Sequence, residues 1–447
     1  MSRLLESSAS LSETSPRVGE ALHDDVAEIL PLRRCITGDG LRATLAAIGR
    51  RVPIEVTEVP SGTDVLDWTV PDEWSVRDAY VALEGRRVVD WQDSALHLVQ
   101  YSQAFRGRLT FDDLRPHLHS LPDQPDLVPY RTSYYGDSWG FCLAHRDLEA
   151  IESAAGRDRV LEVVVDAEKR RGSMSYGEVV FEGETDAEIL LSAHACHPAL
   201  ANDNAASIAV ATMLAERLLD RPKPRHTVRF VFAPGTIGAI TWLDRNRDRL
   251  DRIVGGFVLA NLGDAGPMVY KRSRPGTLGT PAPADRALEV AARDLDVALE
   301  VRPFAPTGYD ERQYGSPGFN LPIGRLTRTP HGEYPEYHTS GDDLDLVKPW
   351  ALEESLFVLE AAVCALDADA RYLNRKPHGE PQLGRRGLYN ALGGPGASQA
   401  QQAMLWVLNL SDGEHSALEV AQRSGLPFDA VRRAIAALED ADLLAHA

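Results

Sequence analysis

Between residues 140 and 375, short apolar runs alternate with longer stretches in which apolar residues recur every three or four positions. The short runs predict β-strands and the periodic stretches predict α-helices. Such an alternation is typical of an α/β fold, in which a mixed sheet has helices on both faces. The predicted strands are 160–165, 179–181, 188–192, 227–233 and 256–262, and the predicted helices are 146–155, 204–219, 236–246, 283–295 and 349–366.

A different pattern precedes this region. After two helical patterns, polar and apolar residues alternate in short runs between residues 54 and 126, which is typical of half-buried strands. A proline-rich stretch at 122–129 then indicates a connection between domains. We therefore predict a small β domain at 60–130, inserted into an α/β domain that comprises residues 17–59 and 131–375.

Both ends of the chain differ from this core. Residues 1–16 are rich in serine and predict a disordered tail. Residues 376–396 are rich in Arg, Pro and Gly and predict a linker. Three helical patterns follow within 397–447; Gly425 ends the second, and Pro427 begins the third. This spacing predicts a winged-helix or helix-turn-helix domain.

Composition narrows the choice of partners. The 447 residues are 44% hydrophobic and 25% charged, which is ordinary for a soluble globular protein. The net charge of −19 argues against general binding of nucleic acid or anionic membranes, and no apolar run is long enough for a membrane span. Four scattered cysteines without a CxxC pair predict a reduced, cytoplasmic protein. The last helical pattern carries several acids, so docking or dimerisation is favoured over DNA reading, and a homo-oligomer is left open.

The strongest chemical signal follows the predicted strand 188–192. His194, His197 and Asp203 lie in the loop between this strand and the next predicted helix. Loops at the carboxyl ends of strands are where α/β sheets carry their sites, and two imidazoles with a carboxylate suit Zn²⁺. The alternative is that the histidines are solvated and that Asn202-Asp-Asn204 is an ordinary turn or helix cap.

These residues, together with Glu336-Tyr-His-Thr-Ser340, resemble zinc aminopeptidases of the transferrin-receptor and glutamate-carboxypeptidase superfamily. The chain is more similar still to bacterial aminopeptidase-like proteins that are often linked to polysaccharide biosynthesis. Those proteins have an inserted domain and a winged-helix tail. Further matching blocks are 67–74, 117–122, 130–135, 139–142 and 310–314.

The resemblance implies a set of metal ligands. His194, Asp203 and His338 correspond to ligands of the superfamily, and His197 replaces or supplements His194. Relatives carry a general-base glutamate in the turn where this chain has Gly235. Thr236 stands at the position of a further ligand, and the strand 256–262 lacks the expected aspartate, with Ala260 and Asn261 in its place. We therefore predict one zinc ion rather than two.

Other acids could replace the missing base. Asp310 and Glu311 lie in one predicted loop, and Glu333 and Glu336 precede His338. Each of these acids could instead be a helix cap or a salt-bridge partner. Three arginines could bind a substrate carboxylate or form ordinary salt bridges; they are Arg312, Arg325 and Arg328.

Two functions remain open at this point. The first is a metal-dependent hydrolase that cleaves an amide or peptide bond of a small peptide or aminoacyl-type substrate. The second is a catalytically impaired, aminopeptidase-like binding or assembly module, which the glycine at position 235 favours. Neither function calls for a membrane or nucleic-acid partner.

Overall fold

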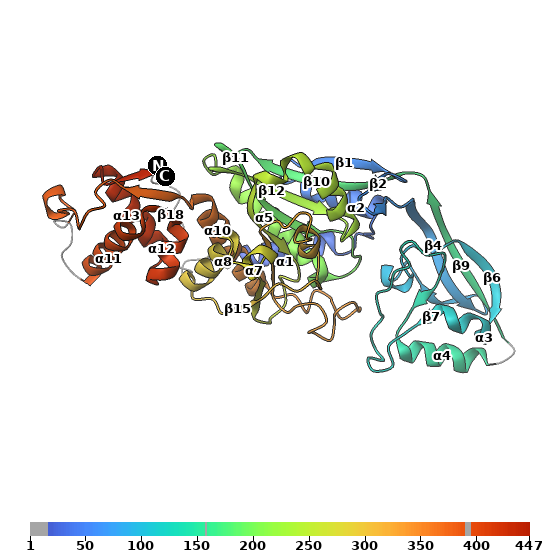
Figure 1. The fold of residues 1–447 in the computed structure, drawn as a ribbon. Coiled ribbons are helices and arrows are strands. Elements are labelled where there is room, and N and C mark those ends of the chain that lie inside the picture. Colours follow the sequence, from blue (N-terminus) through green and yellow to red (C-terminus); the bar gives the residue numbers. More distant parts are fainter. Residues whose placement is uncertain (1–16, 157–158, 389–394) are drawn as a thin grey trace.

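The computed structural model describes residues 17–156, 159–388 and 395–447. The predicted tail 1–16 and part of the predicted linker, residues 389–394, lie outside this range. A central α/β domain carries the C-terminal domain on one side and the small β domain on the opposite side (Figure 1). Among the described residues, no helix is both long and apolar enough to cross a membrane.

An eight-stranded mixed sheet forms the centre of the molecule and confirms the predicted fold class. Its middle strands run parallel, while the strands toward each edge include antiparallel neighbours. In spatial order the strands are β1 (Glu55–Pro60), β10 (Ser173–Phe181), β12 (His226–Ala233), β11 (Thr185–His194), β13 (Ile253–Leu259), β16 (Ile323–Thr327), β14 (Met268–Lys271) and β15 (Leu299–Arg302).

Helices cover both faces of this sheet. Along β11, Ile189 and Leu191 face one apolar core and Leu190 faces the other, because successive side chains of a strand point in opposite directions. The first core is closed by α1 (Arg17–Ile29), α2 (Asp39–Gly49), α5 (Ser207–Leu219), α8 (Pro283–Asp294) and α10 (Pro349–Ala368). The second is closed by α6 (Ile237–Arg245) and the short α9 (Glu311–Tyr314).

The small β domain is larger than its predicted extent of 60–130. Its main sheet has the order β5 (Arg86–Asp90), β4 (Glu73–Leu83), β9 (Val160–Arg170) and β6 (Phe105–Thr110). The sequence assigns the predicted strand 160–165 to the α/β domain, yet β9, which contains it, pairs with β4 and β6 of the small domain. An apolar run shows that a strand is buried but does not show which sheet buries it. The smaller elements are β2 (Asp64–Val65), β3 (Trp68–Thr69), α3 (Phe111–Leu114), β7 (Leu118–His119), β8 (Phe141–Cys142) and α4 (His145–Ala155).

The C-terminal domain is a winged helix. It contains α11 (Pro395–Leu410), α12 (Ala417–Ser424) and α13 (Phe428–Asp440), with a sheet of order β18 (Asp412–Ser416), β17 (Arg371–Asn374) and β19 (Leu444–His446). The domain therefore begins near residue 371 and not at 397, because β17 is the central strand of its sheet. Four mixed residues at 371–374 are too short a pattern to predict a strand.

This domain is docked on α8 of the α/β domain. The Arg293 guanidinium donates to the carbonyl oxygens of Ala421 at 2.9 Å and Leu426 at 2.7 Å. The neighbouring Asp294 carboxylate accepts the backbone N–H of Phe428 at 2.7 Å, at the start of α13. In DNA-binding helix-turn-helix domains, the N-terminal end of the corresponding helix reads the bases. Here that end lies against the α/β domain.

Replacing Arg293 by alanine is expected to loosen this docking by about 3 kcal/mol, because two hydrogen bonds from a charged donor are each worth about 1.5 kcal/mol. Amide hydrogen exchange should become faster in α12 and α13 but not in the central sheet. Arg247→Ala is a suitable control, since Arg247 is bonded to Asp244 on the surface of the α/β domain. Unchanged exchange in Arg293→Ala would mean that apolar packing alone holds the two domains together.

Candidate metal centre

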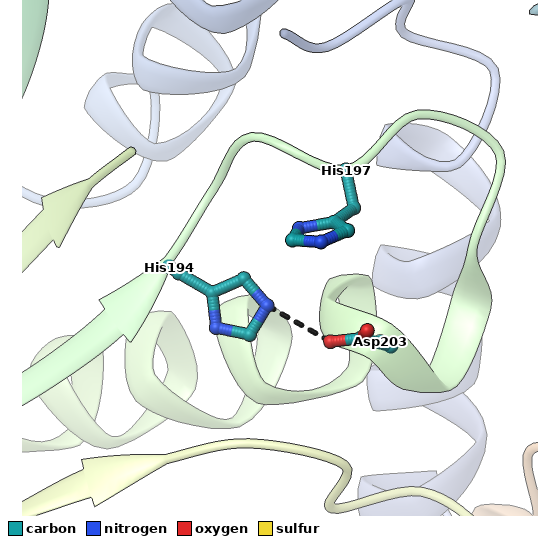
Figure 2. A group of neighbouring side chains, drawn as sticks. All are labelled: His194, His197 and Asp203. Carbon is teal, nitrogen blue, oxygen red and sulfur yellow. Dashed lines mark hydrogen bonds and ion pairs between the residues drawn. The ribbon is translucent and has the colours of Figure 1, made fainter. Parts of the chain in front are cut away.

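The candidate site lies at the carboxyl edge of the central sheet. His194 is the last residue of β11, His197 lies in the following loop, and Asp203 lies in the turn (Ala201–Ala206) that leads into α5. Figure 2 shows that the two imidazole rings and the carboxylate converge on one space. His338, which is far away in the sequence, joins them from the loop before α10.

Asp203 is the centre of this cluster. Its Oδ1 lies 2.8 Å from His194 Nε2 and its Oδ2 lies 3.1 Å from His338 Nε2. The ligand atoms of His194, His197 and Asp203 all lie within 4.8 Å of one another. In a tetrahedral zinc shell with bonds near 2.0 Å, neighbouring ligand atoms are about 3.3 Å apart. The donor types and spacings of this cluster therefore fit a metal ion.

The protonation states also suit a metal. Burial by itself would raise the pKa of Asp203, but the nearby imidazoles of His197, His194 and His338 hold it well below its usual range. Burial lowers the pKa of His197 to about 3. At neutral pH the cluster therefore presents an ionised carboxylate and a neutral imidazole, which are the forms that bind metals.

Asp342 is a buried acid that the sequence analysis did not identify as part of the site. Asp342 accepts the backbone N–H of Asn202 at 2.5 Å and that of Asp203 at 3.0 Å, so it fixes the turn that carries the central carboxylate. Burial, followed by repulsion from Asp203, raises the pKa of Asp342 to about 7. The only signal in the sequence is its place just after His338. Its neighbour Asp343 has the same side chain but is exposed.

Aromatic rings form the walls of the site. Tyr130, from the segment that leaves the small β domain, has its ring centroid 5.1 Å from that of His197 and 4.9 Å from that of His338. Tyr309 stacks on His194, with a centroid distance of 5.1 Å and an angle of 17°. The His338 side chain is 32% exposed, so the cluster meets solvent on that side.

The turn that contains Gly235 borders the cluster directly. A Cβ atom at this position would lie 3.5 Å from Cys196 Sγ and 3.7 Å from His194 Cβ, which are ordinary contact distances. The next residue, Thr236, donates its backbone N–H to the buried Asp310 carboxylate at 2.7 Å. Burial raises the pKa of Asp310, and the nearby His194 opposes this shift. Asp310 is thus a carboxylate beside the position of the missing base.

The remaining candidate acids lie in other surroundings. Glu311 is fully buried, with Lys271 Nζ 2.5 Å from its carboxylate. Glu333 is exposed and paired with Arg302 at 2.5 Å. Glu336 is half-buried in the loop before His338. Among the four acids, Asp310 is the one hydrogen-bonded to the turn at Gly235.

The three candidate arginines also differ in their surroundings. Arg328 is bonded to the carbonyl oxygens of Gly266 and Ala351 and to Glu354, so it anchors α10. Arg312 donates to Thr236 Oγ1 at 3.3 Å. Arg325 is buried close to Glu311.

Asn261 is one of the two residues that the resemblance places where an aspartate is expected, and its side-chain amide is already engaged. It accepts a hydrogen bond from Tyr309 Oη and donates one to Tyr334 Oη, both at 2.8 Å. An amide held in this way supports the walls of the site and adds no negative charge to it. This position therefore offers no second carboxylate for a metal.

A histidine and carboxylate cluster at the carboxyl edge of a mixed α/β sheet defines an aminopeptidase-like, hydrolase-type scaffold. In agreement with this class, the fold is similar to that of a zinc aminopeptidase from Bacillus subtilis, with a TM-score of 0.56 and 12% identity. That comparison covers 77% of this chain and 94% of the aminopeptidase.

The chain belongs to the family described as a domain of unknown function (DUF4910), whose model matches residues 23–369. A winged helix-turn-helix model matches residues 370–446. A Clostridium acetobutylicum protein described as a candidate polysaccharide biosynthesis protein with an aminopeptidase-like domain is 40% identical, over 97% of this chain and 98% of that protein. A crystal structure of a candidate peptidase from Clostridium acetobutylicum has a TM-score of 0.88 at 39% identity and covers 97% of each chain.

Proposed function

We propose that this protein is a metal-dependent hydrolase that cleaves an amide or peptide bond of a small amine-containing substrate. One zinc ion would be held by Asp203 and His338 together with His194 or His197, which leaves one position open for water. The observation that carries the proposal is the convergence of three imidazoles on the buried Asp203 carboxylate. The fold shared with a zinc aminopeptidase supports the same class of reaction.

The chemistry divides between the metal and the chain. A zinc ion held by this cluster would polarise the scissile carbonyl and make a water molecule more acidic. Asp310 is the best-placed proton acceptor, because it is buried beside the turn at Gly235. Its raised pKa also lies closer to neutral pH than that of an ordinary aspartate, which suits a general base. Returning that proton to the departing amine would complete the cleavage.

The proposal of a single metal ion agrees with the absence of further ligand side chains at three positions near the site. Gly235 and Thr236 supply no carboxylate, and the amide of Asn261 is bonded to two tyrosines. The same glycine supports a second candidate function, in which the protein binds metal and ligand without turnover. The two functions differ in one measurable property, which is hydrolysis by the zinc-loaded protein.

The proposed function is tested by elemental analysis together with a panel of aminoacyl amides. Asp310→Asn is expected to lower the hydrolysis rate ~10²–10⁴-fold, the usual effect of losing a general base, while the zinc content stays the same. Glu333→Gln is the matched control, since it changes an exposed carboxylate that is paired with Arg302. Zinc binding without hydrolysis of any amide would favour the binding module, and full activity of Asp310→Asn would exclude Asp310 as the base.

The winged-helix domain is proposed to act in docking rather than in DNA reading. The start of α13 is bonded to Asp294, and the exposed Arg433 is paired with Asp429 at 2.6 Å. The net charge of the chain, −19, is also unfavourable for a phosphate backbone.

A further inference from the structure

Beside the candidate metal centre lies a second charged cluster. Lys271 ends β14 and is the cross-strand neighbour of Arg325 in β16. Both side chains are buried, and both lie close to the carboxylate of Glu311, at 2.5 Å and 3.4 Å. Two buried cations therefore share one buried anion.

This arrangement leaves one positive charge without a partner inside the cluster. A buried charge is costly unless an opposite charge and hydrogen bonds compensate it. Lys271 is well satisfied, because it also donates to the carbonyl oxygens of Ala305 at 2.9 Å and Thr307 at 2.6 Å. Arg325 is only 3% exposed, and its Nε has no hydrogen-bond partner among the described residues. Unused hydrogen-bonding capacity in the cluster thus remains on Arg325 Nε and on Glu311 Oε2, and the excess positive charge is on the cations.

Arg325 determines which ring nitrogen of the neighbouring His331 carries the proton. Arg325 Nη1 lies 3.4 Å from His331 Nδ1, and a guanidinium can only donate, so Nδ1 must be the acceptor. Burial, followed by the charge of Arg325, lowers the pKa of His331, which favours the neutral ring. The proton of a neutral ring then resides on Nε2. His331 is half-buried, so this N–H is a donor next to Arg325 that the residue can present at the partly exposed side of the cluster.

The cluster borders the metal centre through tyrosine rings, Tyr309 on one side and Tyr337, which lies between His331 and His338, on the other. The guanidinium carbon of Arg325 is 5.7 Å from the ring centroid of Tyr309, and the centroid of His331 is 5.3 Å from it. Tyr309 itself stacks on His194. Gly308, next to Tyr309, allows the backbone to lie close to Arg325, because a Cβ at this position would be only 2.8 Å from Arg325 Nη1. Its φ of +134° is also a conformation that favours glycine.

We infer that Arg325 and His331 bind a carboxylate of the substrate beside the metal centre. The neutral imidazole donates from Nε2, and Arg325 supplies the charge that Glu311 leaves uncompensated. This inference rests on the proposed function and narrows its substrate class to peptides and aminoacyl compounds that carry a free carboxylate. Arg328 has no such role, since its guanidinium is bonded to α10 and to Gly266.

The test compares leucylglycine with leucylglycine amide, which differ only in the terminal carboxylate. A hydrogen bond to a charged group is worth about 1.5–3 kcal/mol, so the zinc-loaded protein should favour the free acid about 10–100-fold in kcat/KM. The preference should fall to within about 3-fold in Arg325→Gln and in His331→Ala. Arg302→Gln should retain it, because Arg302 is paired with Glu300 and Glu333 on the surface.

Calorimetric binding of the same two dipeptides separates this inference from the proposed function. If no variant hydrolyses either compound, the hydrolase proposal fails, but tighter binding of the free acid that is lost in His331→Ala still supports the subsite. Equal affinity and equal kcat/KM for the two dipeptides would overturn the inference. A preference that persists in both folded variants would also overturn it. If Arg325→Gln does not fold, the half-exposed His331 carries the test alone.

Discussion

If the wild type has lost activity only because it lacks an effective general base, as in the second candidate function, Gly235→Glu is expected to raise the rate of aminoacyl amide hydrolysis by the zinc-loaded protein ~10²-fold or more, the usual effect of a general base. The structure has room for the first side-chain atom, since a Cβ at this position would meet Cys196 Sγ at 3.5 Å and His194 Cβ at 3.7 Å. The backbone of Gly235 is not in the left-handed region, so the substitution causes no backbone strain.

The reason for the gain is geometric. The turn at Gly235 lies at the end of β12, next to the end of β11, where His194 begins the histidine cluster. A carboxylate that extends from this turn could accept a proton from the attacking water and return it to the leaving amine. Gly235→Gln is the matched control, because it has nearly the same size and no basic carboxylate, and its rate should stay near that of the wild type.

The opposite result would be equally informative. If the wild type already hydrolyses amides and Gly235→Glu slows it, another carboxylate is the base, and Asp310 is the first to examine. The glycine would then serve to leave space for substrate. If both proteins bind zinc and neither hydrolyses any amide, the binding-module function becomes the better account.

The second large effect is expected from Asp203→Asn, which should reduce zinc content from about one ion per chain to below about 0.1 and abolish hydrolysis. Asparagine keeps the size of the side chain but removes the charge that faces His194 and His338. The remaining imidazoles would have to bind a dication without a carboxylate. Elemental analysis after dialysis measures the loss directly.

Two further variants make this result specific. His338→Ala should also lower zinc content, whereas His145→Ala should not, because His145 lies in α4 and is bonded to Ser120. A thermal melt of each protein with and without a chelator separates loss of metal from loss of fold. Full zinc content in folded Asp203→Asn would mean that the metal site lies elsewhere.

Much of this architecture was predictable from local patterns. The strand before His194, the helix after Asp203 and the order of the central elements follow from apolar periodicity, which depends on neighbours in the sequence. Pairing between distant segments does not follow from it. The sheet of β9 and the central strand β17 of the winged helix were therefore missed.

The same limit applies to the candidate site. His194 and Asp203 are recognisable by residue type and spacing, and His338 by the family resemblance, and the structure brings the three together. Asp342 and Tyr130 act through burial and position, which neither composition nor spacing reveals. Conversely, Arg325 and Arg328 look alike in the sequence, but only their hydrogen bonds distinguish an unused donor from a structural anchor.

The segment around Tyr130 couples the small β domain to the candidate metal centre. Pro129 forms a β-bridge with Thr339, and the Tyr130 N–H donates to the His338 carbonyl at 2.8 Å. If metal binding at the histidine cluster changes the position of this segment, the two events are linked, and each changes the free energy of the other by the same amount. A molecule that binds the outer surface of the small β domain and shifts this segment would then change the metal affinity without contacting an imidazole.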